Sequence, residues 1–287
     1  MNDGEYKITD TRGKFTQAAR GGRSFNDAEW TQGRILLSNR RIVLATNDGK
    51  RTVSLGDVVG IEGRQDSSQA IASAAGYVTL RLPDEVLLVA PPDRESFLDS
   101  LYRAFLDDRI ALVQHPAVAG GVVQDTEWQR ARLKVGDDTL NVAVEDGTFV
   151  EIDRDDIGTV DVETREVLGE GRTVVTAEHT EEGTSVQTNL SGSDQRSSVV
   201  ETYLRQGERR SQSNLDLSDA EKEVLVALYS GVSPFEIPDF LGMDVDDVED
   251  IYERLVEADV VEEVRLRREV ALRARGRNIA SEAMNDR

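Results

Sequence analysis

The chain has 287 residues, and its 55 acidic residues outnumber its 34 basic residues, which gives a formal charge of −21 at pH 7. It contains no cysteine, which excludes disulfides, cysteine-ligated metals and a thiol nucleophile. No apolar run approaches the ~20 residues of a membrane-spanning helix, and the N-terminus does not resemble a signal peptide. We therefore expect a cytoplasmic protein.

The kinds of charge also carry information. Most of the bases are arginine, and the five lysines are Lys7, Lys14, Lys50, Lys134 and Lys222. An acidic, lysine-poor surface is typical of proteins from a very salty cytoplasm. The Debye length shrinks to roughly 3 Å in molar salt, so that self-repulsion is screened. The composition predicts a halophilic protein.

The first predicted domain, 1–112, begins with strands. Apolar residues alternate with polar ones through 33–61, interrupted by turn signals at Ser38-Asn39 and at Asp48-Gly49. The second signal is typical of a type I′ hairpin, which requires positive φ at both central residues. YVTLRL (77–82) and EVLLVA (85–90) flank another turn at Pro83-Asp84. From 93 to 108 apolar pairs recur every four residues, which predicts an amphipathic helix with Asp93 as its N-cap.

The same pattern of residues then recurs later in the chain. Glu29-Trp30 and Asp48-Gly49 reappear 98 positions later as Glu127-Trp128 and Asp146-Gly147. Strand-like segments and a helix with apolar residues at 199–200 and 203–204 follow, so 113–207 is predicted as a second copy of the domain. The predicted fold is α+β, with two tandem PH-like (GRAM-like) β-barrels, each closed by a C-terminal helix. We expect the tryptophans at equivalent core positions.

Residues 208–216 are polar and aperiodic and are predicted as a linker. In 217–287, Ser218 and Glu221 form a predicted capping box, and Gly231 is the predicted stop of the first helix. A short helix with Pro234 near its start follows, then a third helix, a hairpin and a last helix, which is the order of a winged helix-turn-helix domain. The first and third helices have predicted inward residues, namely Val224, Leu225, Leu228, Tyr229, Val245, Val248, Ile251, Tyr252 and Leu255.

The third helix is the one that enters the major groove in helix-turn-helix proteins. Here it is strongly acidic: it carries Asp244, Asp246, Asp247, Glu249, Asp250, Glu253 and Glu257, opposed only by Arg254. Because affinity for DNA depends on cations that neutralise phosphates, this helix disfavours a DNA complex. Arginines concentrate in the predicted wing and beyond it, so a winged-helix transcriptional regulator remains the alternative function.

The first repeat contains a cluster of basic residues around its first two hairpins, namely Arg34, Arg40, Arg41, Lys50 and Arg51. Three interpretations are open: solvated strand residues, a docking face for an acidic protein, or a pocket for an anionic lipid headgroup. The second copy has Lys134, Asp137, Asp138, Thr148 and further acidic residues there instead.

No catalytic constellation is evident. His115 lies in a linker-like stretch, and His179 lies in an acidic hairpin tip that is predicted to be solvated. A metal at His179 with Glu178, Glu181 or Glu182 is the alternative for that turn. The chain has no GxxxxGK phosphate loop, and abundant carboxylates are weak evidence for acid–base catalysis in so acidic a chain. We predict a non-enzymatic protein without a cofactor.

Two segments resemble the archaeal taxis protein CheF family: TRGKFTQAARGGRSFNDAEWTQGRILLSNRRIVLATNDGKRTVSL (11–55) and LSDAEKEVLVALYSGVSPFEIPDFLGMDVDDVEDIYERL (217–255). The resemblance implies an adaptor that links the phosphorylated response regulator CheY to the switch proteins at the base of the archaellum. It also implies a location at that base, near the inner face of the membrane and without insertion into it.

This implied role suggests candidate contacts. The CheY contact is expected in the C-terminal domain, through Phe235, Ile237 and Phe240 beside Arg265, Arg267 and Arg268. The switch proteins are expected on the first barrel near Arg40, Arg41 and Arg51. The reverse assignment is equally open.

Overall fold

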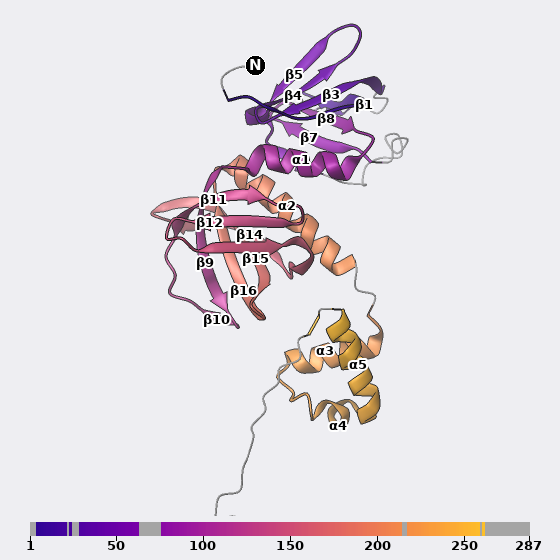
Figure 1. Ribbon diagram of the computed structural model, residues 1–287, viewed down its shortest axis with the longest axis vertical. Coiled ribbons are helices and arrows are strands. Elements are labelled where there is room, and N and C mark those ends of the chain that lie inside the picture. The colour runs from indigo at the N-terminus through magenta and orange to yellow at the C-terminus, as the bar shows by residue number, and fades with distance from the viewer. Residues whose placement is uncertain are drawn as a thin grey trace, which may run out of the picture. The chain divides into compact units, whose positions relative to one another are not determined.

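The computed structural model describes residues 4–21, 23–24, 29–62, 76–213, 217–258 and 260–261. The chain divides into two compact units, 1–215 and 216–287. In its described residues, the first unit contains two antiparallel sheets, each with eight strands, and two α-helices (Figure 1). The second unit is helical in its described part. The predicted α+β class is confirmed.

The first sheet has the strand order β5-β4-β3-β1-β8-β7-β6, and β2 pairs with β1. Its strands are β1 (Lys7–Arg20), β2 (Arg23–Ser24), β3 (Thr31–Ser38), β4 (Arg41–Ala45), β5 (Lys50–Ser54), β6 (Gly60–Glu62), β7 (Val78–Leu82) and β8 (Glu85–Ala90). A short 3₁₀ helix, η1 (Leu55–Asp57), follows β5, and α1 (Arg94–Leu106) follows β8. We call β1 through α1 the first repeat.

The second sheet repeats this order as β13-β12-β11-β9-β16-β15-β14, and β10 pairs with β9. Its strands are β9 (Ile110–Ala119), β10 (Val122–Val123), β11 (Gln129–Val135), β12 (Thr139–Val144), β13 (Phe149–Asp153), β14 (Val160–Val167), β15 (Glu170–Glu181) and β16 (Thr184–Ser191). The 3₁₀ helix η2 (Arg154–Asp156) and α2 (Asp194–Ser213) complete the second repeat. The identical strand orders confirm the duplication that the sequence predicts.

The central strand of each sheet, β1 or β9, was not predicted from the sequence. β1 pairs with β3 over Lys7–Phe15 and with β8 over Lys14–Arg20, so one long strand belongs to both halves of the sheet. Its sequence is too polar to show apolar alternation. Gly13 faces Gly33 where β1 passes from one partner to the other, and a Cβ on Gly33 would lie 2.4 Å from the Ala45 carbonyl oxygen.

Two details of the predicted barrels are wrong. The outermost strands of each sheet, β5 and β6 or β13 and β14, do not pair with each other, so the sheets are open rather than closed barrels. Asp48-Gly49 does lie in the predicted hairpin between β4 and β5, but neither residue has positive φ. That loop extends from residue 46 to 49 and closes through Thr46 N and the Gly49 oxygen, so a two-residue type I′ turn is not needed.

The two predicted helices are confirmed as α1 and α2. The Asp93 carboxylate caps α1 by accepting a hydrogen bond from Ser96 N at 3.0 Å. Both helices bury the predicted apolar stripe, and in α2 this stripe is Val199, Val200, Tyr203 and Leu204. α2 continues to Ser213, into the segment predicted as a linker. Polar contacts hold this extension: Glu208 accepts from Val160 N, and Arg210 pairs with Asp138.

One hydrophobic core includes both repeats. Buried residues of the two sheets and of both helices form a single contiguous cluster. α1 contacts β11 of the second repeat as well as β1 and β3, and α2 contacts β6 of the first repeat. Trp30 and Trp128 immediately precede the equivalent strands β3 and β11, but both are half-buried rather than core residues. The repeats therefore stabilise each other through shared helices.

The C-terminal unit packs α3 (Asp219–Tyr229), α4 (Ile237–Leu241) and α5 (Val245–Glu257) around a small core. The capping box of Ser218 and Glu221 is confirmed, and Gly231, at φ +82°, follows the end of α3 as predicted. Pro238, rather than Pro234, occupies the start of α4. The predicted hairpin and last helix of a winged helix lie outside the described residues.

Two residues predicted to face inward in this unit are exposed instead. Tyr229 is 95% exposed and Val245 is 54% exposed. Ala227 belongs to the buried core on α3 instead, because it lies one helical turn beyond Val224 on the same face.

Candidate protein-interaction surfaces

The outer face of β1, β3, β4 and β5 collects cations. Strand register places Arg12, Arg34, Ala45 and Lys50 in one row across these four strands. The buried Ile35 and Ile42 belong to the opposite face, as the alternation of a strand requires. We call this outer surface the basic face, and its cations are Lys7, Arg12, Lys14, Arg34, Arg41 and Lys50.

The basic face contrasts with the rest of the chain. Its six cations include three of the five lysines, although the whole chain has a formal charge of −21. Among the described residues, these cations form ion pairs with two carboxylates, those of Glu5 and Asp10. Hydrogen bonds from Arg34 and Lys7 lower the pKa of Asp10 to about 2, so this carboxylate is ionised at neutral pH. A surplus of positive charge remains, and it favours an acidic partner.

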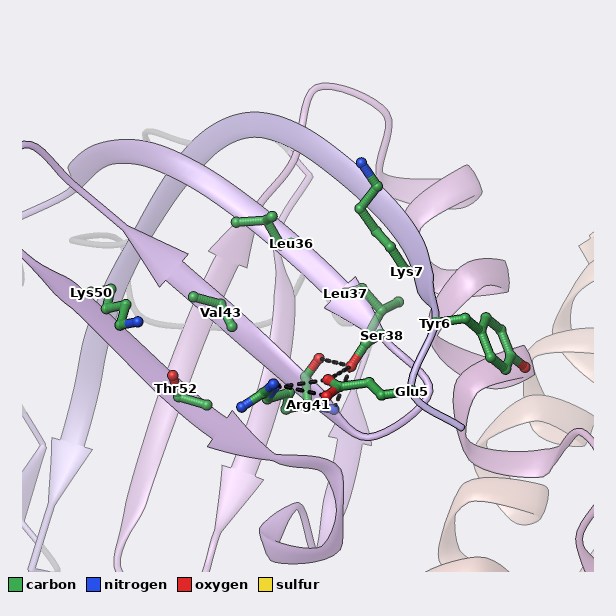
Figure 2. A pocket seen from close by; sticks show the side chains of 10 residues that line it. All are labelled: Glu5, Tyr6, Lys7, Leu36, Leu37, Ser38, Arg41, Val43, Lys50 and Thr52. Atoms are coloured by element: carbon green, nitrogen blue, oxygen red, sulfur yellow. Dashed lines mark hydrogen bonds and ion pairs between the residues drawn. The ribbon is translucent and has the colours of Figure 1, made fainter. Parts of the chain in front are cut away.

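A shallow groove of about 230 Å³ crosses this face (Figure 2). Leu36 of β3 and Val43 of β4 are cross-strand neighbours and form its apolar floor, while Lys7, Arg41 and Lys50 lie at its rim. Next to it, an open depression of about 710 Å³ is lined by residues that include Arg12, Lys14 and Arg34. An apolar floor between cations provides both buried contact area and charge for a protein partner.

Of the five basic residues predicted from the sequence, three lie on this face, namely Arg34, Arg41 and Lys50, whereas Arg51 pairs in register with the buried Leu44 and belongs to the opposite side of β5. Arg34 forms two hydrogen bonds with Asp10, at 2.6 and 2.7 Å. Arg41 forms two with Glu5, both at 2.8 Å. Arg51 pairs with Glu85, and Arg40 lies in the turn between β3 and β4.

Three members of the predicted cluster are therefore paired with carboxylates, namely Arg34, Arg41 and Arg51. Lys50, by contrast, forms no ion pair with the described residues. Three further cations of this face were not predicted, because they lie on β1, a strand that the sequence pattern does not reveal: Lys7, Arg12 and Lys14.

The second repeat has different residues at the positions of this groove's floor. The floor residues Leu36 and Val43, with Thr52 beside them, form one row across β3, β4 and β5. The corresponding row across β11, β12 and β13 is Lys134, Asn141 and Glu151. Charged and polar side chains thus occupy the positions of the apolar floor, and the two repeats differ in what they can bind.

The C-terminal unit exposes part of its predicted contact surface. Phe235 is 93% exposed and Phe240 is 64% exposed, which suits a role in binding. Ile237 is completely buried in the core, so it has no surface to offer a partner, and its inclusion in the predicted contact is wrong. The predicted contact residues Arg265, Arg267 and Arg268 lie outside the described residues.

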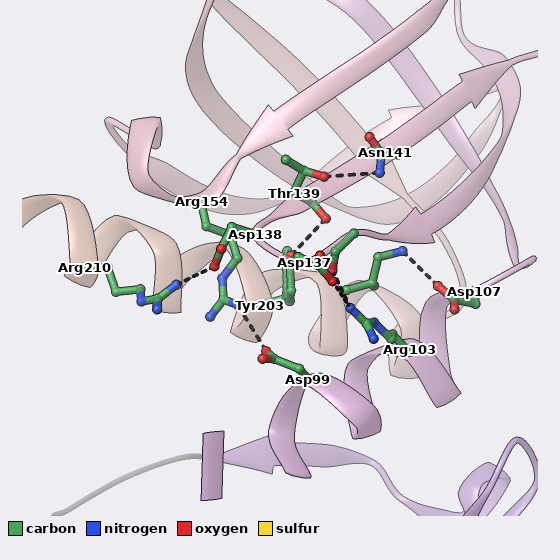
Figure 3. Close-up of polar contacts among 12 residues, drawn as sticks. Asp99, Arg103, Asp107, Asp137, Asp138, Thr139, Asn141, Arg154, Tyr203 and Arg210 are labelled. Atoms are coloured by element: carbon green, nitrogen blue, oxygen red, sulfur yellow. Dashed lines mark hydrogen bonds and ion pairs between the residues drawn. The ribbon is translucent and has the colours of Figure 1, made fainter. Parts of the chain in front are cut away.

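Charged and aromatic contacts join the two repeats (Figure 3). Tyr102 of α1 and Tyr203 of α2 meet edge to face, with ring centroids 5.0 Å apart. Arg154 of η2 lies over the Tyr203 ring at 4.8 Å and pairs with Asp99 of α1 at 3.1 Å. Arg103 of α1 donates to Asp137 at 2.8 Å. Burial raises the pKa of both tyrosines, which remain neutral, and the Tyr203 hydroxyl donates to the Thr139 carbonyl oxygen at 3.0 Å.

The two histidines lie together in the second repeat, with ring centroids 6.1 Å apart. His115 belongs to β9 rather than to a linker, and His179 of β15 is 2% exposed rather than solvated. The Thr188 hydroxyl contacts His115 Nδ1 at 2.7 Å and His179 Nε2 at 2.9 Å. Glu181 lies 3.0 Å from His115 Nε2.

The setting of this pair indicates a structural role. Burial, together with the neighbouring His115, lowers the pKa of His179. Within the described residues, no group of three or more His, Cys, Asp or Glu side chains is arranged to hold a metal ion. Strand pairing between β9, β15 and β16 brings the two rings together, and no local sequence signal marks them as neighbours.

The described helices include none that is long and apolar enough to span a membrane. α5 presents an acidic surface, with Asp246, Asp247, Glu249 and Asp250 all exposed. The predicted DNA-binding alternative therefore finds no support, since phosphate contacts require cations.

Comparisons with known proteins identify the family. Residues 7–210 match the family described as archaeal chemotaxis signal transduction system protein F, and residues 216–285 match a domain family of unknown function. Over 289 aligned residues, covering all of both chains, the sequence is 51% identical to the taxis protein CheF1 of Halobacterium salinarum. It is 25% identical to the taxis protein CheF2 of the same organism, over 90% of this chain and 92% of that one. The chain therefore belongs to the archaeal chemotaxis signal transduction protein F family, CheF.

Proposed function

We propose that this protein is a non-enzymatic adaptor that connects the phosphorylated response regulator CheY to the switch proteins at the base of the archaellum. Family membership supports a role in taxis signalling. The single observation that carries the adaptor role is the basic face. It gathers cations around an apolar groove on a chain that is otherwise strongly acidic.

The proposed architecture is two PH-like domains followed by a winged helix, used for protein contacts. In each repeat a long first strand is shared by the two halves of the sheet, and a helix follows the last strand. This arrangement supports the PH-like assignment, although the sheets are open. Folds of this kind carry many unrelated functions, so the argument for function rests on the surface.

The switch proteins dock on the basic face and the adjoining Arg40 in this proposal, and CheY docks on the C-terminal unit through Phe235 and Phe240. Phosphorylation acts on CheY, whose active conformation has the higher affinity for one unchanged surface of the adaptor. The protein works in a salty cytoplasm near the inner face of the membrane. There, short-range contacts matter more than long-range attraction, because salt screens distant charges.

The test is capture of purified CheY and purified switch proteins by the full-length chain in molar KCl. CheY is used with and without beryllofluoride, which mimics its phosphoryl group. We expect capture of the switch proteins in both conditions and stronger capture of CheY with the mimic. Failure to capture either partner refutes the adaptor role.

A charge-reversed variant locates the site. Arg12→Glu with Lys50→Glu changes two exposed cations that form no ion pair with described residues, so the fold is left intact. We expect switch-protein capture to fall at least tenfold while CheY capture is unchanged. Lys134→Glu, in the second repeat, is the matched control. If the double variant weakens CheY capture instead, the assignment is reversed: CheY docks on the basic face and the switch proteins dock on the C-terminal unit.

A further inference from the structure

The carboxylate of Glu5 is held by the turn between β3 and β4. Arg41 donates to it through Nε and one terminal nitrogen, both at 2.8 Å, and the Ser38 hydroxyl donates to it at 2.9 Å (Figure 2). The Glu5 side chain is 6% exposed. The hydrogen bonds from Ser38 and Arg41 lower the pKa of this carboxyl group, so Glu5 is ionised at neutral pH. Ser38 and Arg41 thus form a carboxylate-binding site with charge-assisted hydrogen bonds.

The turn itself orients the Ser38 hydroxyl for an anion. The backbone amides of Arg40 and Arg41 donate to Ser38 Oγ at 3.2 and 3.0 Å, so the hydroxyl hydrogen is available for donation. Leu36 and Val43, the apolar floor of the groove on the basic face, line the same groove as Ser38 and Arg41. A bound carboxylate therefore has apolar surface beside it, which suits the side chain of a protein partner.

Polar contacts hold the segment that carries Glu5, residues 4–6, which we call the N-terminal strap. Asn39 Nδ2 donates to the Gly4 oxygen at 3.0 Å, and Asn39 Oδ1 accepts from Tyr6 N at 3.1 Å. The Asn39 backbone amide donates to the Tyr6 oxygen at 3.3 Å. Tyr6 is 54% exposed, so its ring contributes little apolar burial. Since water or a partner can replace such hydrogen bonds at small net cost, the strap can be displaced.

In the second repeat, a helix covers the equivalent turn. Arg103 follows Glu5 by the same 98 positions that relate the strands of the two repeats. It belongs to α1, which contacts β11. In the turn between β11 and β12, Arg103 donates to the Gly136 oxygen at 3.1 Å and to Asp137 at 2.8 Å (Figure 3). The strap of the first repeat therefore occupies a place that the fold uses elsewhere to seat a helix.

The charges of the two contacts are reversed. In the second repeat the helix supplies the cation and the turn supplies the acid Asp137, whereas in the first repeat the turn supplies Arg41. A helix seated on the first turn therefore complements it when the helix carries a carboxylate. We propose that the β3–β4 turn docks a partner helix whose carboxylate replaces that of Glu5 between Ser38 and Arg41. Apolar side chains of the same helix then cover the floor of the groove.

The strap acts as a placeholder in this proposal, because its own carboxylate must leave before the partner's can bind. With a switch protein as the partner, the inference rests on the proposed function. The docking site itself is tested without any taxis protein, using a designed alanine-based helical peptide. The peptide has one glutamate with leucines three and four residues away, on the same face of the helix. A control peptide has glutamine in place of the glutamate.

NMR titration of the full-length chain in about 2 M KCl follows the Arg41 Nε–H signal. We expect a saturable shift with the glutamate peptide and none with the control peptide. Glu5→Gln should bind the glutamate peptide about tenfold more tightly than the wild type, because the competing charge is gone. Asp10→Asn, which removes an equal charge from the same face, is the matched control and should have no such effect. An Arg41 signal that does not move overturns the proposal, as does a Glu5→Gln variant that binds no better.

Capture of purified switch proteins provides a second measurement. Glu5→Gln should strengthen capture and Arg41→Gln should weaken it, each by about tenfold, and circular dichroism checks that both variants are folded. If the peptide binds but the wild type captures no switch protein, the docking site stands and the proposed function fails. If capture occurs but Glu5→Gln does not strengthen it, the strap does not compete with the partner and the proposal is overturned.

Discussion

Replacement of Arg154 tests how the two repeats are held together. Its side chain is 3% exposed, pairs with Asp99 at 3.1 Å and covers the Tyr203 ring at 4.8 Å. The 3₁₀ helix of the first repeat begins with the buried Leu55, where that of the second repeat begins with Arg154. An apolar side chain therefore suits this position in the fold, and the arginine serves the contact between repeats.

The expected loss of unfolding free energy follows from the burial of the Arg154 side chain. Removing one partner of a buried ion pair costs about 3–5 kcal/mol, but Asp99 remains one-third exposed and can be rehydrated, so the lower end applies. The lost cation–π contact is part of this loss, at about 1–2 kcal/mol for a desolvated pair. We expect Arg154→Ala to lower the free energy of unfolding by about 3 kcal/mol.

Arg154→Leu should cost clearly less, about 1 kcal/mol, because leucine refills the apolar space. The substitution also removes the buried Arg154 Nε, which has no hydrogen-bond partner. Adding Asp99→Asn should reduce the remaining loss, since no unpaired carboxylate is left. The assay is urea denaturation followed by tryptophan fluorescence, in 0.5 and 2 M KCl. Equal losses for the alanine and leucine variants would refute this reasoning, because the charge alone would then matter.

Three further predictions concern other parts of the chain. Gly33→Ala should destabilise the first unit by about 1–3 kcal/mol in urea denaturation, because the new Cβ meets the Ala45 oxygen and Phe15, whereas Gly49→Ala, in open space, should be nearly neutral. Ser218→Ala removes the N-cap of α3 and should cost the C-terminal unit about 1 kcal/mol, measured as faster hydrogen exchange of α3 amides with no change in β3. The pKa of His179 is lowered from 6.5 in the folded state, so its contribution to stability is complete above about pH 6.5 and declines as the pH falls from there towards the folded pKa. The stability difference between His179→Gln and the wild type should therefore shrink between pH 7.5 and 5.5, and a constant difference contradicts the assignment.

The local elements were predictable because short-range chemistry determines them. Asp93 and Ser218 cap helices as expected, since an N-cap needs only a side chain and nearby backbone amides. The recurrence of Glu-Trp and Asp-Gly at one spacing revealed the duplication, because equivalent residues build equivalent hairpins. α2 and its apolar stripe also followed from periodicity alone.

Tertiary structure decided what long-range strand pairing brings together. β1 carries too few apolar residues to be recognised, yet its pairing with β3 places Lys7, Arg12 and Lys14 beside Arg34. His115 and His179 are 64 positions apart and meet only because β9 and β15 both pair with β16. Composition determined the acidic character of the chain, whereas sheet register determined where its few cations gather, because neighbours across strands have no fixed separation in sequence.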